Sequence, residues 1–148
     1  KRLVPGYEAP VYISWSDANR STMIRIPATR GKSTRIEVRS VDPSTNPYLG
    51  MSALLASGLD GIKTNMDAIP PIKKNLFKMS YRELRKLKID HLPGSLKEAM
   101  TLFEKSKLMK EAIGEDIFYK LIEAKTSEWD DYRTHVTDWE IKKYLEVI

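Results

Sequence analysis

The sequence predicts an α+β fold in which short antiparallel strands come first and helices follow. Short segments of alternating apolar and polar residues are confined to residues 11–39, whereas residues 47–147 carry the signals that begin and end helices. A chain of 148 residues with 30% charged and 41% hydrophobic residues is long and apolar enough for one globular domain. We expect this domain to divide into a strand-and-loop part, residues 1–39, and a mainly helical part, residues 40–148.

Three short segments, residues 11–15, 22–26 and 35–39, are expected to be the strands. Turn-forming stretches separate them, and the second stretch contains Gly31. Short runs of β-branched and aromatic residues between turn residues are typical of strands. We expect the three strands to pair in antiparallel fashion.

Charged and aliphatic side chains alternate in the third strand. Because successive side chains on a strand point to opposite faces, Ile36 and Val38 should face a core, while Arg35, Glu37 and Arg39 face the other way. Glu37 would then lie between two guanidinium groups. This pattern suits a metal-bound phosphate, because a carboxylate binds the cation and arginines bind the anionic oxygens. The alternative is that these charges only neutralise each other on a solvated face, where ion pairs add little stability.

Asn46 and Pro47 mark the start of the first helix, which should run to about Lys63. Asparagine caps a helix well, and proline is favourable at the first helical position because the N–H it lacks would have no partner there. The helix is rich in Ala, Gly, Ser and Leu, so we expect it to pack closely on both sides and to be buried.

Later helix starts are predicted by capping boxes, in which Ser or Thr is followed three residues later by Glu. A longer helix is expected after Gly114, and a short one over residues 138–147. That last helix is too short to be stable alone, so it should dock on another surface, with a second subunit as one candidate. The three boxes pair Ser80 with Glu83, Ser95 with Glu98, and Thr137 with Glu140.

The net charge of +5 belongs to residues 1–39. They hold eight Lys or Arg against three Asp or Glu, whereas the remaining residues hold 17 of each sign. A positive field on one segment favours an anionic ligand. This segment contains no basic helix or known nucleic-acid module, so we expect no direct binding of nucleic acid. A basic nucleic-acid binder is kept as the weakest alternative function.

Several classes of protein are excluded or disfavoured by what the sequence lacks. It has no cysteine, which excludes disulfides and thiolate metal sites. It has no apolar run that could span a bilayer, so we expect no membrane partner and a cytoplasmic location. Gly31, Lys32 and Ser33 match only the end of a Walker-type phosphate loop, so any ATP should bind in another way.

Five motifs in the first third of the chain resemble the C-terminal part of bacterial type I glutamine synthetase. The resemblance continues through LDGI at 59–62, LPGSL at 92–96 and EAK at 123–125, and covers essentially the whole chain. The front motifs are the more specific ones. They are KRLVPGYEAP at 1–10, NRS at 19–21, RIP at 25–27, RIEVR at 35–39 and DPSTNPY at 42–48.

The resemblance implies that the full-length protein joins ammonia to L-glutamate with ATP, through γ-glutamyl phosphate. Arg2 and Arg39 then bind the substrate glutamate. Glu8 resembles the flap glutamate that closes over the site and helps to deprotonate ammonium, so it is both catalytic and substrate-binding. Arg20 resembles the arginine that steadies the transferring phosphoryl group.

The remaining implied roles concern ATP and its metal. Arg20, Arg25, Lys32 and Arg35 resemble contacts to the ATP phosphates. Glu37 resembles a ligand to a divalent cation, Mg²⁺ or Mn²⁺. Because such a cation binds about six oxygens, its other ligands are expected in preceding sequence, and this chain alone is expected to be inactive.

The resemblance also implies an assembly and a mode of control. Family members form a homododecamer of two hexameric rings, in which the last helix is the candidate for reaching across rings. Some members carry a regulatory tyrosine that is nucleotidylated, whereas the matching position here is Phe77, which has no hydroxyl. Control by feedback inhibition and partner proteins is therefore expected instead.

Two other functions stay open on the sequence. One is a related ATP-dependent ligase that joins an amine to another carboxylate. The other is a regulatory or interaction module that keeps the strands but performs no chemistry.

Overall fold

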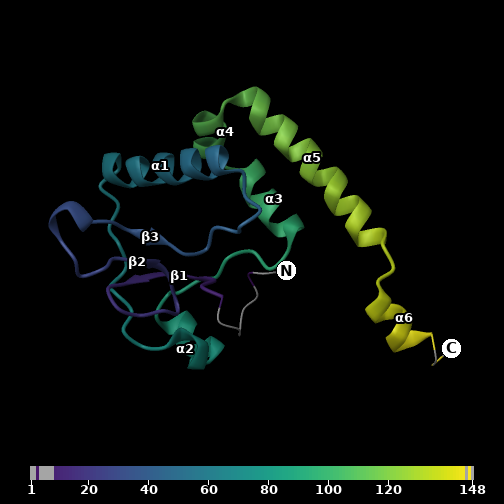
Figure 1. Ribbon diagram of the computed structural model, residues 1–148, viewed down its shortest axis with the longest axis horizontal. Coiled ribbons are helices and arrows are strands. Elements are labelled where there is room, and N and C mark those ends of the chain that lie inside the picture. The colour runs from purple at the N-terminus through teal and green to yellow at the C-terminus, as the bar shows by residue number, and fades with distance from the viewer. Residues whose placement is uncertain (1–2, 4–8, 146, 148) are drawn as a thin grey trace.

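A computed structural model describes residues 3, 9–145 and 147 (Figure 1). A small three-stranded sheet lies below helix α1, short helix α2 lies at the other side of the sheet, and α3 to α6 form an arm that leads away from it. The fold is α+β, as predicted. The elements are β1 Tyr12–Ser16, β2 Thr22–Arg25, η1 Gly31–Ser33, β3 Glu37–Val38, α1 Pro47–Lys63, η2 Leu76–Lys78, α2 Tyr81–Lys86, α3 Leu96–Glu104, α4 Lys107–Ile113, α5 Glu115–Thr134 and α6 Asp138–Tyr144.

The strands are ordered β1-β2-β3. Strands β2 and β3 are antiparallel, as predicted, with Arg25 directly opposite Glu37. Strands β1 and β2 are parallel, so the prediction for this pair was wrong. The link 17–21 carries the chain back to the start of β1, and within it the side chain of Asn19 donates to the backbone carbonyls of residues 72 and 74. Sequence patterns do not reveal contacts of this range.

The core lies between β1, the segment 72–76 and α2. Leu76 and Val11 are fully buried in it, and the ring of Phe77 packs near that of Tyr12, with centroids 6.3 Å apart. The buried cluster consists of Val11, Tyr12, Ile72, Leu76, Leu84 and Ile89. This cluster supports the first two strands and the link between them.

Helix α1 begins as predicted. Asn46 accepts hydrogen bonds from the backbone N–H groups of Tyr48 and Leu49, and Pro47 is the first helical residue. The predicted burial was wrong, however, because no residue of α1 is buried. The described residues cover only part of the helix, with α4 as its main neighbour.

An apolar groove of about 770 Å³ separates α1 from the segment around β3. Ile36, which we expected in a core, lines this groove and is 64% exposed, and Val38 lines it beside Ile36. Leu54 and Leu55 face the groove from α1. The alternation therefore correctly predicted that Ile36 and Val38 share one face of the third strand. The predicted burial of that face was wrong, because the described residues leave the groove beside it open.

The helical arm is held by aromatic packing between α3 and α5. The rings of Phe103 and Phe118 stack with centroids 4.8 Å apart, and Met100 and Phe118 are buried. Helix α4, which the sequence patterns did not predict, is capped by Ser106. It ends at Gly114, whose φ of +82° is a conformation that favours glycine and allows α5 to begin at once.

Two of the three predicted capping boxes form completely, at Ser80 and at Thr137. The third box, at Ser95, forms only one of its two hydrogen bonds. Ser95 accepts from the N–H of Glu98, but the carboxylate of Glu98 accepts from the N–H of Gly94. No helix in the described part of the chain is long and apolar enough to cross a membrane.

We expect acid to weaken helix α6. The backbone N–H and the hydroxyl of Thr137 donate hydrogen bonds of 2.8 and 2.7 Å to the Glu140 carboxylate and lower the pKa of that group. Because the pKa is lower in the folded than in the unfolded state, the stabilisation is present above the ordinary value of about 4.5 and is lost as the pH falls through the lowered value. The ¹³Cα chemical shifts of residues 138–144 should move towards coil values in that range. Glu140→Gln keeps the capping box without the titration, so an equal acid response in that variant would contradict the assignment.

Candidate functional site

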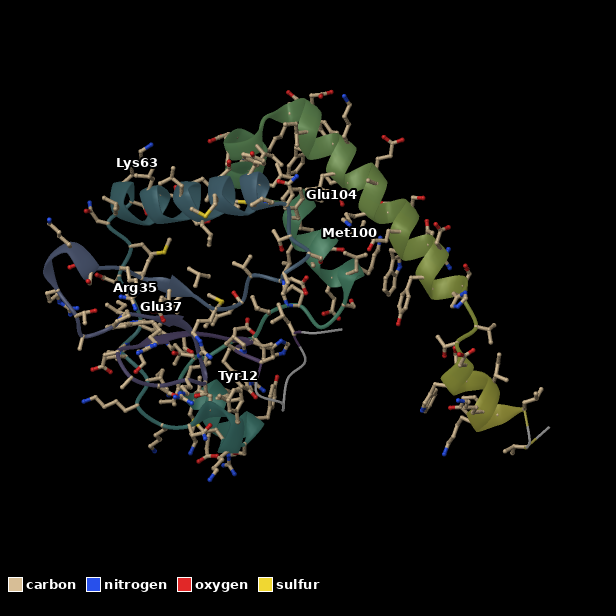
Figure 2. The ribbon with its side chains drawn as sticks, in the orientation of Figure 1. Tyr12, Arg35, Glu37, Lys63, Met100 and Glu104 are labelled. Carbon is tan, nitrogen blue, oxygen red and sulfur yellow. The ribbon has the colours of Figure 1, made fainter. Side chains whose placement is uncertain are left out.

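The centre of the candidate site is the Glu37 carboxylate on β3. Because Arg25 on β2 lies opposite Glu37, its Nη1 reaches Glu37 Oε2 at 3.2 Å. Arg35 precedes β3 and donates from Nε and Nη2 to Glu37 Oε1, at 3.0 and 2.7 Å. Figure 2 shows Arg35 and Glu37 side by side at one edge of the molecule. One carboxylate is thus held by two guanidinium groups.

The two arginines are not the pair that we predicted. Arg39 does not contact Glu37 in the structure, and its Nη1 donates to the backbone carbonyls of Arg20 and Thr22. The prediction failed because it considered a single strand. The antiparallel register brings Arg25 from the neighbouring strand to Glu37, while the backbone N–H of Arg39 bonds to Met23 and its side chain extends along β2.

The exposure of this cluster matters for its chemistry. The side chain of Glu37 is 29% exposed, and those of Arg25 and Arg35 are 43% and 51% exposed. Ion pairs as exposed as these contribute little to stability because solvent screens them. The three charges are therefore better explained by a ligand than by a need of the fold, and they are accessible to one.

We tested whether Glu37 suits a divalent cation. A carboxylate has about four lone-pair directions, of which Arg35 uses two on Oε1 and Arg25 uses one on Oε2. The remaining direction on Oε2 fits one metal bond. Among the described residues no group of three or more His, Asp or Glu could complete a metal site. Glu37 thus has room for one bond to a cation, and the described residues would not complete such a site by themselves.

The other predicted phosphate-binding residues lie at separate places around the sheet. Lys32 lies on the exposed turn η1 between β2 and β3. Arg20 lies in the link between β1 and β2 and is exposed. It lines a hollow of about 500 Å³ together with Lys73 and Asn75. The fold brings Arg20 next to Arg39 through the hydrogen bond to its carbonyl.

Two predicted site residues, Arg2 and Glu8, lie outside the described residues, so their roles stay predictions. Two other residues of interest, Asn19 and Ser21, had no predicted role although they flank Arg20. The sequence marked them only as part of the family motif NRS at 19–21, in which two polar residues flank an arginine in a short link. Nothing in the sequence indicated that Lys73 would lie beside Arg20.

The class of protein is thus an α+β protein with a partly exposed carboxylate held between two guanidinium groups on a small sheet flanked by helices. Comparison with known proteins gives the family. The sequence profile described as glutamine synthetase, catalytic domain, matches residues 1–144. The chain belongs to the glutamine synthetase catalytic-domain family.

Relatives support this assignment along nearly the whole chain. The glutamine synthetase of Methanococcus maripaludis is 51% identical over 147 residues, which are 99% of this chain and 33% of that protein. The glutamine synthetase of Thermotoga maritima is 52% identical over 145 residues, 98% of this chain and 33% of that protein. The chain thus spans about a third of the length of these relatives.

A solved structure shares the fold. A protein described as "Apo GmaS without ligand" superposes with a TM-score of 0.76 and 32% sequence identity, over 92% of this chain and 30% of that one. The arrangement of sheet and helical arm is therefore that of a larger protein of known structure.

Proposed function

We propose that this chain is the C-terminal part of a glutamine synthetase, which joins ammonia to L-glutamate with ATP through γ-glutamyl phosphate. The observation that carries the proposal is the Arg25–Glu37–Arg35 cluster in a chain that is about half identical to glutamine synthetases. Phosphoryl transfer needs positioning and charge neutralisation more than covalent chemistry, and this cluster supplies both kinds of charge.

In this proposal the described residues divide the work between metal, ATP and glutamate. Glu37 is one ligand of Mg²⁺ or Mn²⁺, which neutralises charge on the ATP phosphates. Arg25 and Arg35 bind phosphate oxygens next to that cation, and their ion pairs with Glu37 support these roles. Lys32 adds an exposed positive charge from the neighbouring turn, and Arg20 steadies the transferring phosphoryl group.

The glutamate-side roles rest on Arg39, Arg2 and Glu8. Arg39 has five N–H donors and spends Nη1 on the backbone of the β1–β2 link, so others are available to a carboxylate. Arg2 binds the substrate as well, and Glu8 closes over it as a flap. The proposed whole protein is a cytoplasmic dodecamer of two hexameric rings. The exposed Trp139 of α6, with Leu145 directly after this helix, provides apolar surface for the contact between rings.

The test is ATP-dependent γ-glutamyl hydroxamate formation by the longer protein that contains this chain. We expect activity that requires glutamate, ATP and either Mg²⁺ or Mn²⁺, and that stops when the metal is chelated. Activity with another carboxylate or with an alkylamine in preference to ammonia would favour the related amine ligase. A folded longer protein without ligase activity on any of these substrates would contradict the proposal and favour a non-catalytic module.

A further inference from the structure

We propose that Asn19 and Ser21 are positioning residues that hold Arg20 in place for the ATP phosphates, by tying the β1–β2 link to the segment 72–76. The inference rests on the proposed function, because it assumes that Arg20 acts on the transferring phosphoryl group. We call this set of hydrogen bonds between residues 19 and 21 and the segment 72–76 the latch.

Asn19 uses all the hydrogen-bonding capacity of its side-chain amide nitrogen in the latch. Nδ2 donates to the carbonyls of Ile72 at 2.9 Å and Lys74 at 2.7 Å. Oδ1 accepts from the backbone N–H and the hydroxyl of Ser21, at 2.9 and 2.7 Å. Because the two carbonyls accept only, the amide has one orientation that satisfies all four bonds. The side chain is therefore locked.

Ser21 makes the second connection. Its side chain is nearly fully buried, and the same hydroxyl that donates to Asn19 accepts a 2.9 Å hydrogen bond from the backbone N–H of Leu76. A continuous chain of bonds thus runs from Leu76 through Ser21 to Asn19 and back to the carbonyls of Ile72 and Lys74.

The far end of the latch is rigid because it belongs to the core. Ile72 and Leu76 are buried in the main apolar cluster. The N–H of Ile72 also donates to the carbonyl of Trp15 on β1, at 2.9 Å. Residues 19 and 21 are therefore anchored to a segment that belongs to the buried apolar cluster.

Arg20 is the one residue between these two anchors, and its own carbonyl accepts from Arg39 Nη1. The backbone of Arg20 is thus fixed by the anchored residue before it, by the anchored residue after it and by the hydrogen bond from Arg39. Its side chain is exposed and lines the hollow shared with Lys73. An arginine on an ordinary surface link would pay the full entropy of ordering its side chain and its backbone on binding. Here the backbone of Arg20 is already ordered before binding, so that part of the entropy cost is absent. Ordering a charged group in advance in this way favours stabilisation of a transition state.

Asn19→Asp in the longer protein is the test variant. Aspartate has the same shape and still accepts from Ser21, but it places an oxygen instead of an NH₂ group against the carbonyls of Ile72 and Lys74. We expect kcat for hydroxamate formation to fall about 10- to 100-fold, the scale of an ångström-sized misplacement of a catalytic group. Because Arg39 donates to the carbonyls of Arg20 and Thr22, the KM for glutamate is measured as well, and a rise in KM larger than the fall in kcat would show that the latch acts through Arg39 instead of Arg20.

A double-mutant cycle with Arg20→Ala separates positioning from a structural role. If Asn19 acts through Arg20, Asn19→Asp should cost less than about 3-fold in the Arg20→Ala background, because the group it positions is gone. The same loss in both backgrounds would overturn the proposal and make the latch purely structural. Ser21→Ala, which removes the link to Leu76 without adding charge, gives a second cycle with the same expected result if Asn19→Asp does not fold.

The controls keep this inference distinct from the proposed function. Asn65→Asp adds the same charge on an exposed loop in a left-handed conformation that aspartate tolerates, and should leave kcat unchanged. A longer protein without ligase activity would contradict the proposed function itself. An active protein in which Arg20→Ala leaves kcat unchanged would retain the function and overturn the latch proposal, because there would be nothing to position.

Discussion

Glu37→Gln in the longer protein is expected to lower the rate of hydroxamate formation by at least about 100-fold at limiting metal, and the loss should shrink as Mn²⁺ is raised. Removing one electrostatic group that acts on the transition state has effects of this size. Glutamine keeps the shape of the side chain but loses the charge that binds the cation and the two guanidinium groups. Steady-state rates over a metal titration are the measurement.

The matched control is Glu104→Gln, at the exposed end of α3 and far from Glu37 in Figure 2. It should change neither the rate nor the metal dependence. The ion pairs of Glu37 are too exposed to contribute much stability, so the thermal unfolding temperature of Glu37→Gln should stay close to that of the unmodified protein. An unchanged metal dependence in Glu37→Gln would show that Glu37 is not a metal ligand.

Leu76→Ala is expected to destabilise this chain by about 3 kcal/mol, within the range of about 2–5 kcal/mol for a buried leucine. Leu76 is fully buried between β1, Ile72 and α2, so truncation leaves a cavity that these elements cannot close without moving. The backbone N–H of Leu76 still bonds to Ser21, so the loss reports packing and not the latch. The measurement is the urea midpoint at unchanged slope.

Leu55→Ala is the control for this effect, because Leu55 is 65% exposed on α1 and lines the open groove. It should change the stability of the chain by less than about 0.5 kcal/mol. An equal loss of stability in the two variants would mean that Leu55 is packed as well as Leu76. That result would contradict the burial seen in the structure.

The predictions that succeeded rest on interactions within a few residues of one another. Asn46 with Pro47 gave the start of α1, and the boxes at Ser80 and Thr137 gave the starts of α2 and α6. In each of these caps the side chain hydrogen-bonds to a backbone group two or three residues away. The cap can therefore be predicted without knowing the position of any other part of the chain. The contact between Arg35 and Glu37 succeeded for the same reason.

The predictions that failed needed a partner from elsewhere in the chain. The parallel pairing of β1 and β2 places Asn19 against residues more than 50 positions away in the sequence. The second guanidinium on Glu37 comes from β2 and not from Arg39, because the strand register decides the neighbour. Burial of α1 was inferred from its composition and burial of Ile36 from the alternation along its strand, and both patterns say that a surface is apolar but not what covers it.

By itself, the sequence determined that strands precede helices, where every described α-helix except α4 begins, the positive first segment and the resemblance to its family, since all of these depend on residues close together in the chain. Only the tertiary structure decided which arginines surround Glu37 and that Arg20 sits between two anchored residues. The physical reason is that both arrangements are made by hydrogen bonds across 12 and about 55 residues, and such contacts exist only after the chain has folded back on itself.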